Sequence, residues 1–226
     1  MFDLGAGSGA ITARLAATGA RVIAVERDPK LAARLRRRFC RDPRVHVVEA
    51  DLRTIPLPRR EFLVVASPPF SLTRALCRRL LADRAVRLLG AELILQLEAA
   101  RRLADPRPRD AETAWWSARY QMHVVRVISP ASFAPPPFAN AAWLSVRSRP
   151  VAASARGERC LREILRLAYR RPSVRTEVAV AVRPRLLLSA GLDPALPVAG
   201  VTADQWHRLA VELSGGDLGA SRSRRR

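Results

Sequence analysis

Short apolar segments alternate with amphipathic segments along the first part of the chain. Apolar and β-branched residues predict strands over residues 1–4, 21–26, 45–50, 61–66 and 91–97. Helical periodicity predicts helices over residues 8–18 and 72–82, and a further helix that Asp28 caps and Pro29 begins. Because strands that alternate with helices form a parallel sheet covered on both faces, we expect an α/β fold.

The pattern changes in the second part of the chain. Strands predicted over residues 121–128 and 141–147 flank a Pro-rich loop, which indicates an antiparallel edge to the sheet. Residues 150–157 are typical of a linker, and helices follow over residues 161–168, 186–190 and 205–213. We therefore expect an α/β domain over residues 1–149, a small all-helical domain over residues 150–220 and a disordered basic tail over residues 221–226.

The charge balance points to a polyanionic partner. The 226 residues contain 40 Lys and Arg against 20 Asp and Glu, for a net charge of +20. Lys30 is the only lysine, and GC-rich codon usage explains that choice of arginine but not the shortage of acids. The excess of cations favours nucleic acid as the partner.

Several other classes of protein are disfavoured. The cysteines and histidines are isolated from one another, without a metal-ligating spacing: Cys40, Cys77, Cys160, His46, His123 and His207. We expect no metal, no structural disulfide and a reducing cytoplasm as the location. No apolar run approaches the roughly 18 residues of a membrane helix.

A glycine-rich segment, Asp3-Leu4-Gly5-Ala6-Gly7-Ser8-Gly9, joins the first predicted strand to the first predicted helix. Glycines there let the backbone turn sharply and approach a ligand closely. Glu26 ends the next predicted strand, where an acid can accept hydrogen bonds from both ribose hydroxyls of a nucleotide-like cofactor. The alternative for Glu26 is a solvated acid at the end of a strand.

Two classes of cofactor share this layout. Dinucleotide enzymes carry Gly-x-Gly-x-x-Gly, which holds a pyrophosphate at a helix start, whereas here Gly9 comes one residue early. Asp3 would repel a pyrophosphate, but it suits the cationic sulfonium and ammonium groups of S-adenosylmethionine. Asp51 follows the third predicted strand and can accept a hydrogen bond from an adenine amino group, or alternatively cap a helix. Together these features favour S-adenosylmethionine.

The segment Ser67-Pro68-Pro69-Phe70 follows the fourth predicted strand and has the pattern of the loop that amino-group methyltransferases use. An exocyclic amine of adenine is a poor nucleophile, because the ring delocalises its lone pair. The Ser67 hydroxyl and the Pro68 carbonyl can accept its protons, while the prolines hold the loop rigid. Phe70 can stack on a base taken out of its stack. The alternative is a plain strand-to-helix turn.

The chain resembles the ribosomal RNA adenine N6-dimethyltransferases, in particular the Erm-type enzymes of large-subunit rRNA that confer macrolide resistance. The resemblance also includes residues 95–100, 116–121 and 132–137 and the helical C-terminal part. It implies a Rossmann-like methyltransferase sheet, a helical RNA-binding domain, and a monomer that methylates adenine in rRNA. We assign catalysis to Ser67, Pro68 and Phe70. We assign cofactor binding to Asp3, Gly5, Gly7, Gly9, Glu26, Arg27, Asp51, Leu52 and Ser67.

Two departures from the family pattern matter. Ser67 stands where the family usually has Asn, so the addition of one or two methyl groups is left open. The family also carries a segment before the first strand, and we expect that segment to be encoded upstream of Met1. Alternatives are a small-subunit rRNA dimethyltransferase, an amino-methyltransferase of DNA or glutamine, and a non-catalytic RNA-binding relative. Trp115 and Trp116 fit core positions better than base stacking.

Overall fold

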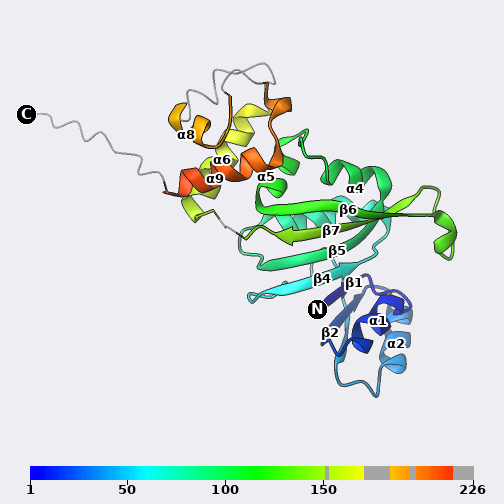
Figure 1. The fold of residues 1–226 in the computed structure, drawn as a ribbon. Coiled ribbons are helices and arrows are strands. Elements are labelled where there is room, and N and C mark those ends of the chain that lie inside the picture. The colour runs from blue at the N-terminus through cyan, green and yellow to red at the C-terminus, as the bar shows by residue number, and fades with distance from the viewer. Residues whose placement is uncertain (151–152, 171–183, 194–196, 216–226) are drawn as a thin grey trace, which may run out of the picture. The chain divides into compact units, whose positions relative to one another are not determined.

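The computed structural model describes residues 1–150, 153–170, 184–193 and 197–215 (Figure 1). The chain divides into two compact units, one formed by Met1–Asp105 with Tyr120–Arg149 and the other by Pro106–Arg119 with Pro150–Arg226. The boundary expected after residue 149 coincides with a change of unit. Residues 106–119, expected in the α/β domain, instead group with the helical unit. The basic tail predicted over residues 221–226 lies outside the described residues.

The first unit contains a seven-stranded sheet with the order β3-β2-β1-β4-β5-β7-β6. Five strands run parallel: β1 (Phe2–Leu4), β2 (Val22–Glu26), β3 (Val45–Glu49), β4 (Phe62–Ala66) and β5 (Leu88–Gln96). β7 (Ala141–Ser148) pairs antiparallel with β5, and β6 (Tyr120–Ile128) pairs antiparallel with β7. The parallel sheet with an antiparallel edge is therefore confirmed.

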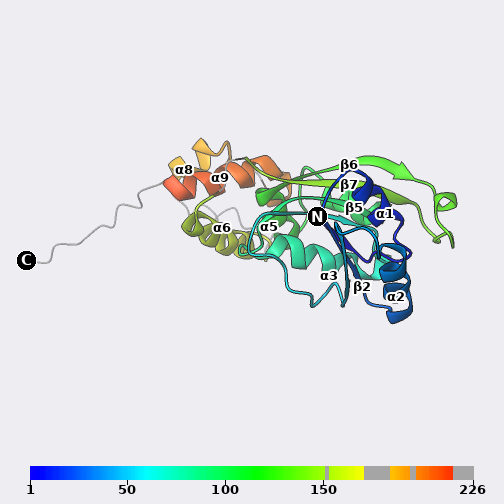
Figure 2. The ribbon, with the colours of Figure 1, turned by 90° about the horizontal axis from the view of Figure 1, so that it is seen from below.

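One helix of this unit, α2 (Pro29–Arg38), begins where the local sequence signal places it. α2 starts after Asp28, whose carboxylate accepts hydrogen bonds from the backbone N–H groups of Lys30 and Leu31 at 2.7 and 3.1 Å. The helix predicted over residues 72–82 consists of a 3₁₀ turn (Phe70–Leu72), α3 (Thr73–Cys77) and a π-helical turn (Arg78–Ala82). The unit also contains α1 (Ala10–Ala17), within the helix predicted over residues 8–18, and α4 (Leu97–Leu103), which was not predicted from the sequence. Figure 2 gives a second view of the fold.

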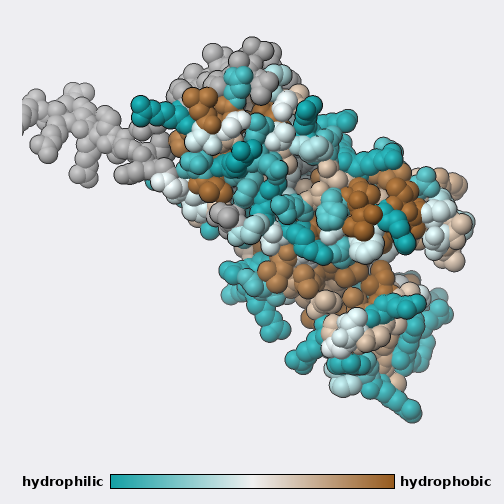
Figure 3. Space-filling model, in the orientation of Figure 1, coloured by the Kyte–Doolittle hydropathy of each residue, from teal (hydrophilic) through white to brown (hydrophobic). Residues whose placement is uncertain are grey.

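The parallel strands bring their carboxyl ends to one edge of the sheet. Leu4, Val25 and Ala66 are buried there and anchor the loops that follow β1, β2 and β4. Leu35 of α2 is fully buried and forms a core cluster with Ala6 and Ala24. In the view of Figure 3, apolar side chains are also exposed over the part of the sheet formed by β4 and β5.

The second unit consists of α5 (Ala111–Arg119), α6 (Ala155–Ala168), α8 (Pro184–Ser189), the 3₁₀ turn Val198–Gly200 and α9 (Ala203–Gly215). The hydroxyl of Ser154 caps α6 by accepting a hydrogen bond from the N–H of Gly157 at 3.2 Å. The linker predicted over residues 150–157 is therefore too long, since residues 155–157 are helical. The stripe predicted on this helix is confirmed, because Leu161, Ile164, Leu165 and Ala168 are all buried.

Helix α5 was not predicted from the sequence. Its residues 113–118 are all buried, so they lack the alternation of apolar and polar positions that marks an amphipathic helix. Trp115 and Trp116 lie in the core, as expected. Arg119, at the end of this helix, forms an ion pair with Glu158 of α6 at 3.4 Å.

Within the described ranges, no helix combines the length and the apolar character needed to cross a membrane. The same residues contain no group of three or more His, Cys, Asp or Glu side chains arranged to hold a metal ion.

Candidate active site

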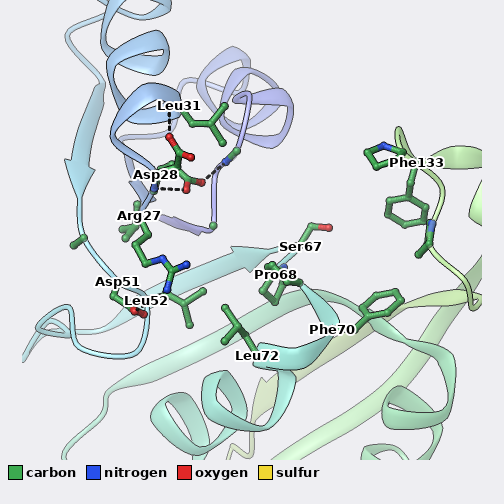
Figure 4. A pocket seen from close by; sticks show the side chains of 18 of the residues that line it. Arg27, Asp28, Leu31, Asp51, Leu52, Ser67, Pro68, Phe70, Leu72 and Phe133 are labelled. Carbon is green, nitrogen blue, oxygen red and sulfur yellow. Dashed lines mark hydrogen bonds and ion pairs between the residues drawn. The ribbon is translucent and has the colours of Figure 1, made fainter.

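A cavity of about 630 Å³ opens at the carboxyl ends of the parallel strands (Figure 4). Its walls come from the glycine loop after β1, the β2–α2 junction, the segment after β3, the Ser67–Phe70 loop after β4, and the loop between β6 and β7. A volume of this size is within the usual range of small-molecule sites. The topology thus joins motifs that lie up to about 130 residues apart in the sequence, as parallel strands do when their loops meet at one edge.

The glycine loop contributes Gly5 and Gly7 to the cavity wall. The backbone N–H groups of Gly5 and Ala6 donate to the Val25 carbonyl at 2.9 and 3.0 Å, which holds the loop against β2. Gly5 has a φ of +82°, and a Cβ there would lie 3.7 Å from the Pro68 Cα. The positive φ is what calls for a glycine here, since a Cβ 3.7 Å from the Pro68 Cα would make only an ordinary van der Waals contact.

Gly9 was expected to bind the cofactor, but it does not line the cavity. It precedes α1 with a φ of +84°, and a Cβ at this residue would lie 2.6 Å from Leu35 Cδ2 and 2.9 Å from Phe39 Cε2. The residues that line the cavity do not include Gly9. Its small size allows α1 and α2 to pack closely, so it supports the loop from behind rather than contacting a ligand.

Glu26 lines the cavity and braces two loops at once. Its Oε2 accepts a hydrogen bond from the Gly7 N–H at 2.8 Å, and its Oε1 accepts one from the Asp28 N–H at 2.9 Å. Each carboxylate oxygen has a second lone pair, so Glu26 can still accept from a ligand hydroxyl. Sequence reasoning placed Glu26 at the site but did not foresee its bond to Gly7.

Asp51 lines the cavity beside Arg27 and Leu52. Its carboxylate pairs with Arg53 at 2.6 Å and approaches Arg27 at 3.8 Å. The hydrogen bonds from Arg53, followed by the nearby positive charges, lower the pKa of Asp51 to about 2. No helix begins at Asp51, since the next element along the chain is β4. The carboxylate accepts a hydrogen bond from the Arg53 N–H at 2.8 Å, and the Asp51 carbonyl accepts from the N–H groups of Thr54 and Ile55 at 3.0 and 2.9 Å, which closes a turn. The helix-cap alternative is therefore wrong.

Asp3 is fully buried within β1 and lies behind the glycine loop rather than in the cavity wall. The Thr12 hydroxyl donates to its Oδ2 at 2.6 Å, while its Oδ1 has no hydrogen-bond partner. Loss of hydration raises the pKa of Asp3 to about 6. A direct contact with a cofactor is not supported by this position, but a negative charge here still attracts a cation bound at the loop.

The Ser67–Phe70 loop forms the wall next to the glycine loop, because β1 and β4 are neighbours in the sheet. Ser67, Pro68, Pro69 and Phe70 all line the cavity, and Phe70 begins the 3₁₀ turn after the two prolines. Figure 4 shows Phe133, from the loop between β6 and β7, across the open part of the cavity from Phe70. Phe133 was not assigned to the site from the sequence, although it lies in the motif over residues 132–137.

Most of the chain also matches a known protein family. A family model described as ribosomal RNA adenine dimethylase matches residues 1–214. The chain belongs to the ribosomal RNA adenine dimethylase family. Among solved structures, this dimethylase-family chain is similar to the 23S rRNA methyltransferase ErmE, with a TM-score of 0.77 and 26% identity over 94% of this chain and 89% of that one. The Rossmann-like methyltransferase fold is thereby confirmed.

Curated relatives of this dimethylase-family chain carry two kinds of name. An rRNA adenine N-6-methyltransferase of Bacteroides fragilis is 30% identical over 149 residues, which cover 66% of this chain and 56% of the relative. A ribosomal RNA small subunit methyltransferase A of Synechococcus sp. (strain JA-3-3Ab) is 33% identical over 171 residues, which cover 73% and 61%. The chain thus spans between about half and two thirds of the length of these relatives.

Proposed function

We propose that this protein transfers methyl groups from S-adenosylmethionine to the exocyclic N6 of an adenine in ribosomal RNA. One observation carries the proposal: the glycine loop with Glu26 and the Ser67–Phe70 loop form neighbouring walls of the same cavity. A methyl donor held by the first wall lies next to a base held by the second. Direct transfer needs that proximity, since the methyl group moves from donor to acceptor in one step.

The first wall has groups that fit S-adenosylmethionine. Its loop approaches a ligand through Gly5 and Gly7, and Glu26 keeps lone pairs for ribose hydroxyls. Asp51, ionised because of Arg53, offers a carboxylate to the adenine amino group, while Arg27 and Leu52 line the same end. The cofactor supplies a methyl group already activated by its positive sulfonium. The unpartnered Oδ1 of Asp3 places negative charge behind the loop that would hold this cation.

The second wall has groups that fit an adenine. The Ser67 hydroxyl and the Pro68 carbonyl accept hydrogen bonds from the amine, which orients its lone pair toward the donor. Phe70 stacks on the base, and Phe133 encloses it from the loop between β6 and β7. The amine loses its proton to water after transfer, so the wall needs acceptors and not a strong base. Transfer in this arrangement depends on position rather than on proton abstraction.

Ribosomal RNA is the partner that suits the rest of the chain. The net charge of +20 favours a polyanion, and α6 exposes Arg156, Arg159, Arg162 and Arg166 on one side of the helix. We assign RNA binding to the helical region over residues 150–220. We further expect a cytoplasmic monomer. The similarity to a 23S rRNA methyltransferase over 94% of the chain favours large-subunit rRNA, and hence macrolide resistance, as the outcome.

The second candidate is a small-subunit rRNA dimethyltransferase of ribosome biogenesis, which the Synechococcus relative supports. The test offers the purified protein and S-adenosylmethionine to unmodified 23S rRNA, 16S rRNA and duplex DNA, and measures methyladenosines by mass spectrometry. We expect N6-methyladenosines in 23S rRNA alone. Modification of 16S rRNA alone would favour the second candidate, and modification of DNA would contradict both. Binding of S-adenosylmethionine measured by calorimetry, without transfer to any substrate, would indicate a non-catalytic relative.

A further inference from the structure

Phe138 is the most exposed large apolar side chain among the described residues. Its relative exposed area is 112%, whereas the other exposed large apolar residues range from 40% to 62%. A phenylalanine in this position buries nothing within the fold, so it gives up the stabilisation that an aromatic core residue provides. Its neighbour in the chain, Pro137, lines the cavity. Phe138 therefore directly follows a cavity-lining residue, in the loop that also contains Phe133.

The loop that carries Phe138 is unlike the rest of the chain. Residues 129–140 contain no charged side chain, although 27% of all residues are charged. A loop without cations is unsuited to holding phosphates, which makes the bases the part of a nucleic acid that it can contact. The exposed ring fits that use, since every base has a face on which an aromatic side chain can stack.

This loop is also fixed at both ends. It begins with a 3₁₀ turn (Pro130–Ser132) capped by the Ser129 hydroxyl, and ends where the Asn140 carbonyl accepts from the Leu97 N–H at 2.9 Å. Pro135, Pro136 and Pro137 directly precede Phe138, and each fixes its own φ. The ring is thus presented from a stiff support, which reduces the entropy lost when it binds.

We propose that Phe138 inserts into the base stack beside the target adenine and occupies the place that the adenine leaves. This inference rests on the proposed function. An adenine inside a stack cannot reach Ser67, so it must leave the stack, and unstacking costs a few kcal/mol. Apolar side chains that wedge between bases offset this cost in other nucleic-acid complexes. A protein or lipid partner for Phe138 is the competing possibility, and the experiment distinguishes them.

The experiment compares two RNA hairpins with S-adenosylmethionine and the full chain. The first hairpin has the target adenine stacked and paired, and the second has it unpaired opposite an abasic site. We expect Phe138→Ala to lower kcat/KM for the first hairpin by about 5- to 100-fold, as expected for the loss of one stacked aromatic ring. The effect on the second hairpin should be several times smaller, because its adenine is already free. Phe138→Trp should restore activity on the first hairpin.

A second readout and a matched control complete the test. With 2-aminopurine beside the target, the parent should change the fluorescence on binding RNA, and Phe138→Ala should not. Leu89→Ala removes another exposed apolar side chain, 41% exposed at the amino end of β5 and away from the cavity, and should leave both readouts unchanged. If Phe138→Ala has the kinetics of the parent on both hairpins, the proposed insertion of Phe138 into the base stack is wrong, while the proposed function still stands. Phe138 would then be expected to contact a protein or lipid partner. A parent that methylates neither hairpin nor any rRNA would overturn the proposed function and the wedge with it.

Discussion

The Glu26 carboxylate accepts a hydrogen bond from the backbone N–H of Gly7 at 2.8 Å, and this bond joins the end of β2 to the loop after β1. The other oxygen of Glu26 holds the Asp28 N–H at 2.9 Å, just before α2. One side chain thus sets the positions of two segments that line the cavity. Glu26 therefore shapes the cavity through both oxygens of its carboxylate.

Glu26→Ala should weaken binding of S-adenosylmethionine by about 1.5–3 kcal/mol, because charge-assisted hydrogen bonds are lost. Calorimetry on the purified protein measures this directly. Glu26→Gln keeps one acceptor oxygen and should lose less affinity. Glu49→Ala removes a carboxylate at the end of the adjacent strand β3, which pairs with Arg36 at 3.2 Å, and serves as the control. Equal affinities of Glu26→Ala and the parent would contradict the assignment of the cofactor.

The structural features that the sequence predicts correctly depend on residues that are close to one another in the chain. The α2 cap depends on Asp28 and Pro29, which are neighbours in the chain, and the strand and helix pattern depends on spacing within each segment. The bond between Glu26 and Gly7 depends on how two strands pair, and Phe133 reaches the cavity only because β7 inserts between β5 and β6. Helix α5 carries no amphipathic signal, because its central residues are buried all round. These contacts follow from the assembled sheet and helical unit rather than from any single segment.

Gly9→Ala should destabilise the protein more than Gly19→Ala. Both glycines have a φ near +84°, so both substitutions introduce similar backbone strain, about 1–2 kcal/mol. A Cβ at Gly19 meets nothing within 4 Å, whereas a Cβ at Gly9 lies 2.6 Å from Leu35 Cδ2. We expect the crowding to add about 1–3 kcal/mol at Gly9, measured as a shift in the urea unfolding midpoint. Equal shifts for the two variants would show that Gly9 does not fix the packing of α1 on α2.

The buried carboxyl of Asp3 predicts a pH dependence of stability. Its pKa is raised from 3.8 to about 6, so the folded state binds the proton more tightly than the unfolded state does. Proton binding to Asp3 therefore stabilises the folded state fully below pH 4, and this stabilisation is lost as the pH rises through 6. A shift of two units corresponds to about 3 kcal/mol. The stability of Asp3→Asn relative to the parent should therefore rise by roughly that amount between pH 4 and pH 8.

Thermal unfolding of both proteins across this pH range tests the prediction for Asp3. Thr12→Val provides a second test of the same carboxyl, because it removes the hydroxyl that donates to Asp3 without changing the charge. Loss of that donor should raise the pKa of Asp3 further, so the pH-dependent loss of stability should occur at a higher pH than in the parent. A difference between Asp3→Asn and the parent that stays constant with pH would contradict the burial of a titrating carboxyl.

Phe70→Ala should reduce methyl transfer much more than cofactor binding. The lost stacking on a flipped base is worth about 1–3 kcal/mol, while the glycine loop, Glu26 and Asp51 remain in place. Single-turnover rates on rRNA and calorimetry with S-adenosylmethionine separate the two effects. Phe70→Tyr keeps the ring and should stay close to the parent. Similar losses of rate and of cofactor affinity in Phe70→Ala would instead place Phe70 in the packing of the cofactor wall.

Ser67 gives the sharpest test of how the amine is oriented. Ser67→Ala removes one of the two acceptors at the end of β4 and should lower the rate of transfer by about 10- to 100-fold, because a positioned polar group in a water-poor site is worth a few kcal/mol. Ser67→Asn supplies an amide oxygen with a longer reach and should raise the rate or shift the product from mono- to dimethyladenine. Mass spectrometry of adenosines from treated rRNA reads out both variants. Ser67 has no role in activation if Ser67→Ala methylates as fast as the parent while Pro68 and Phe70 are unchanged, and the loop after β4 is then a turn that only shapes the cavity.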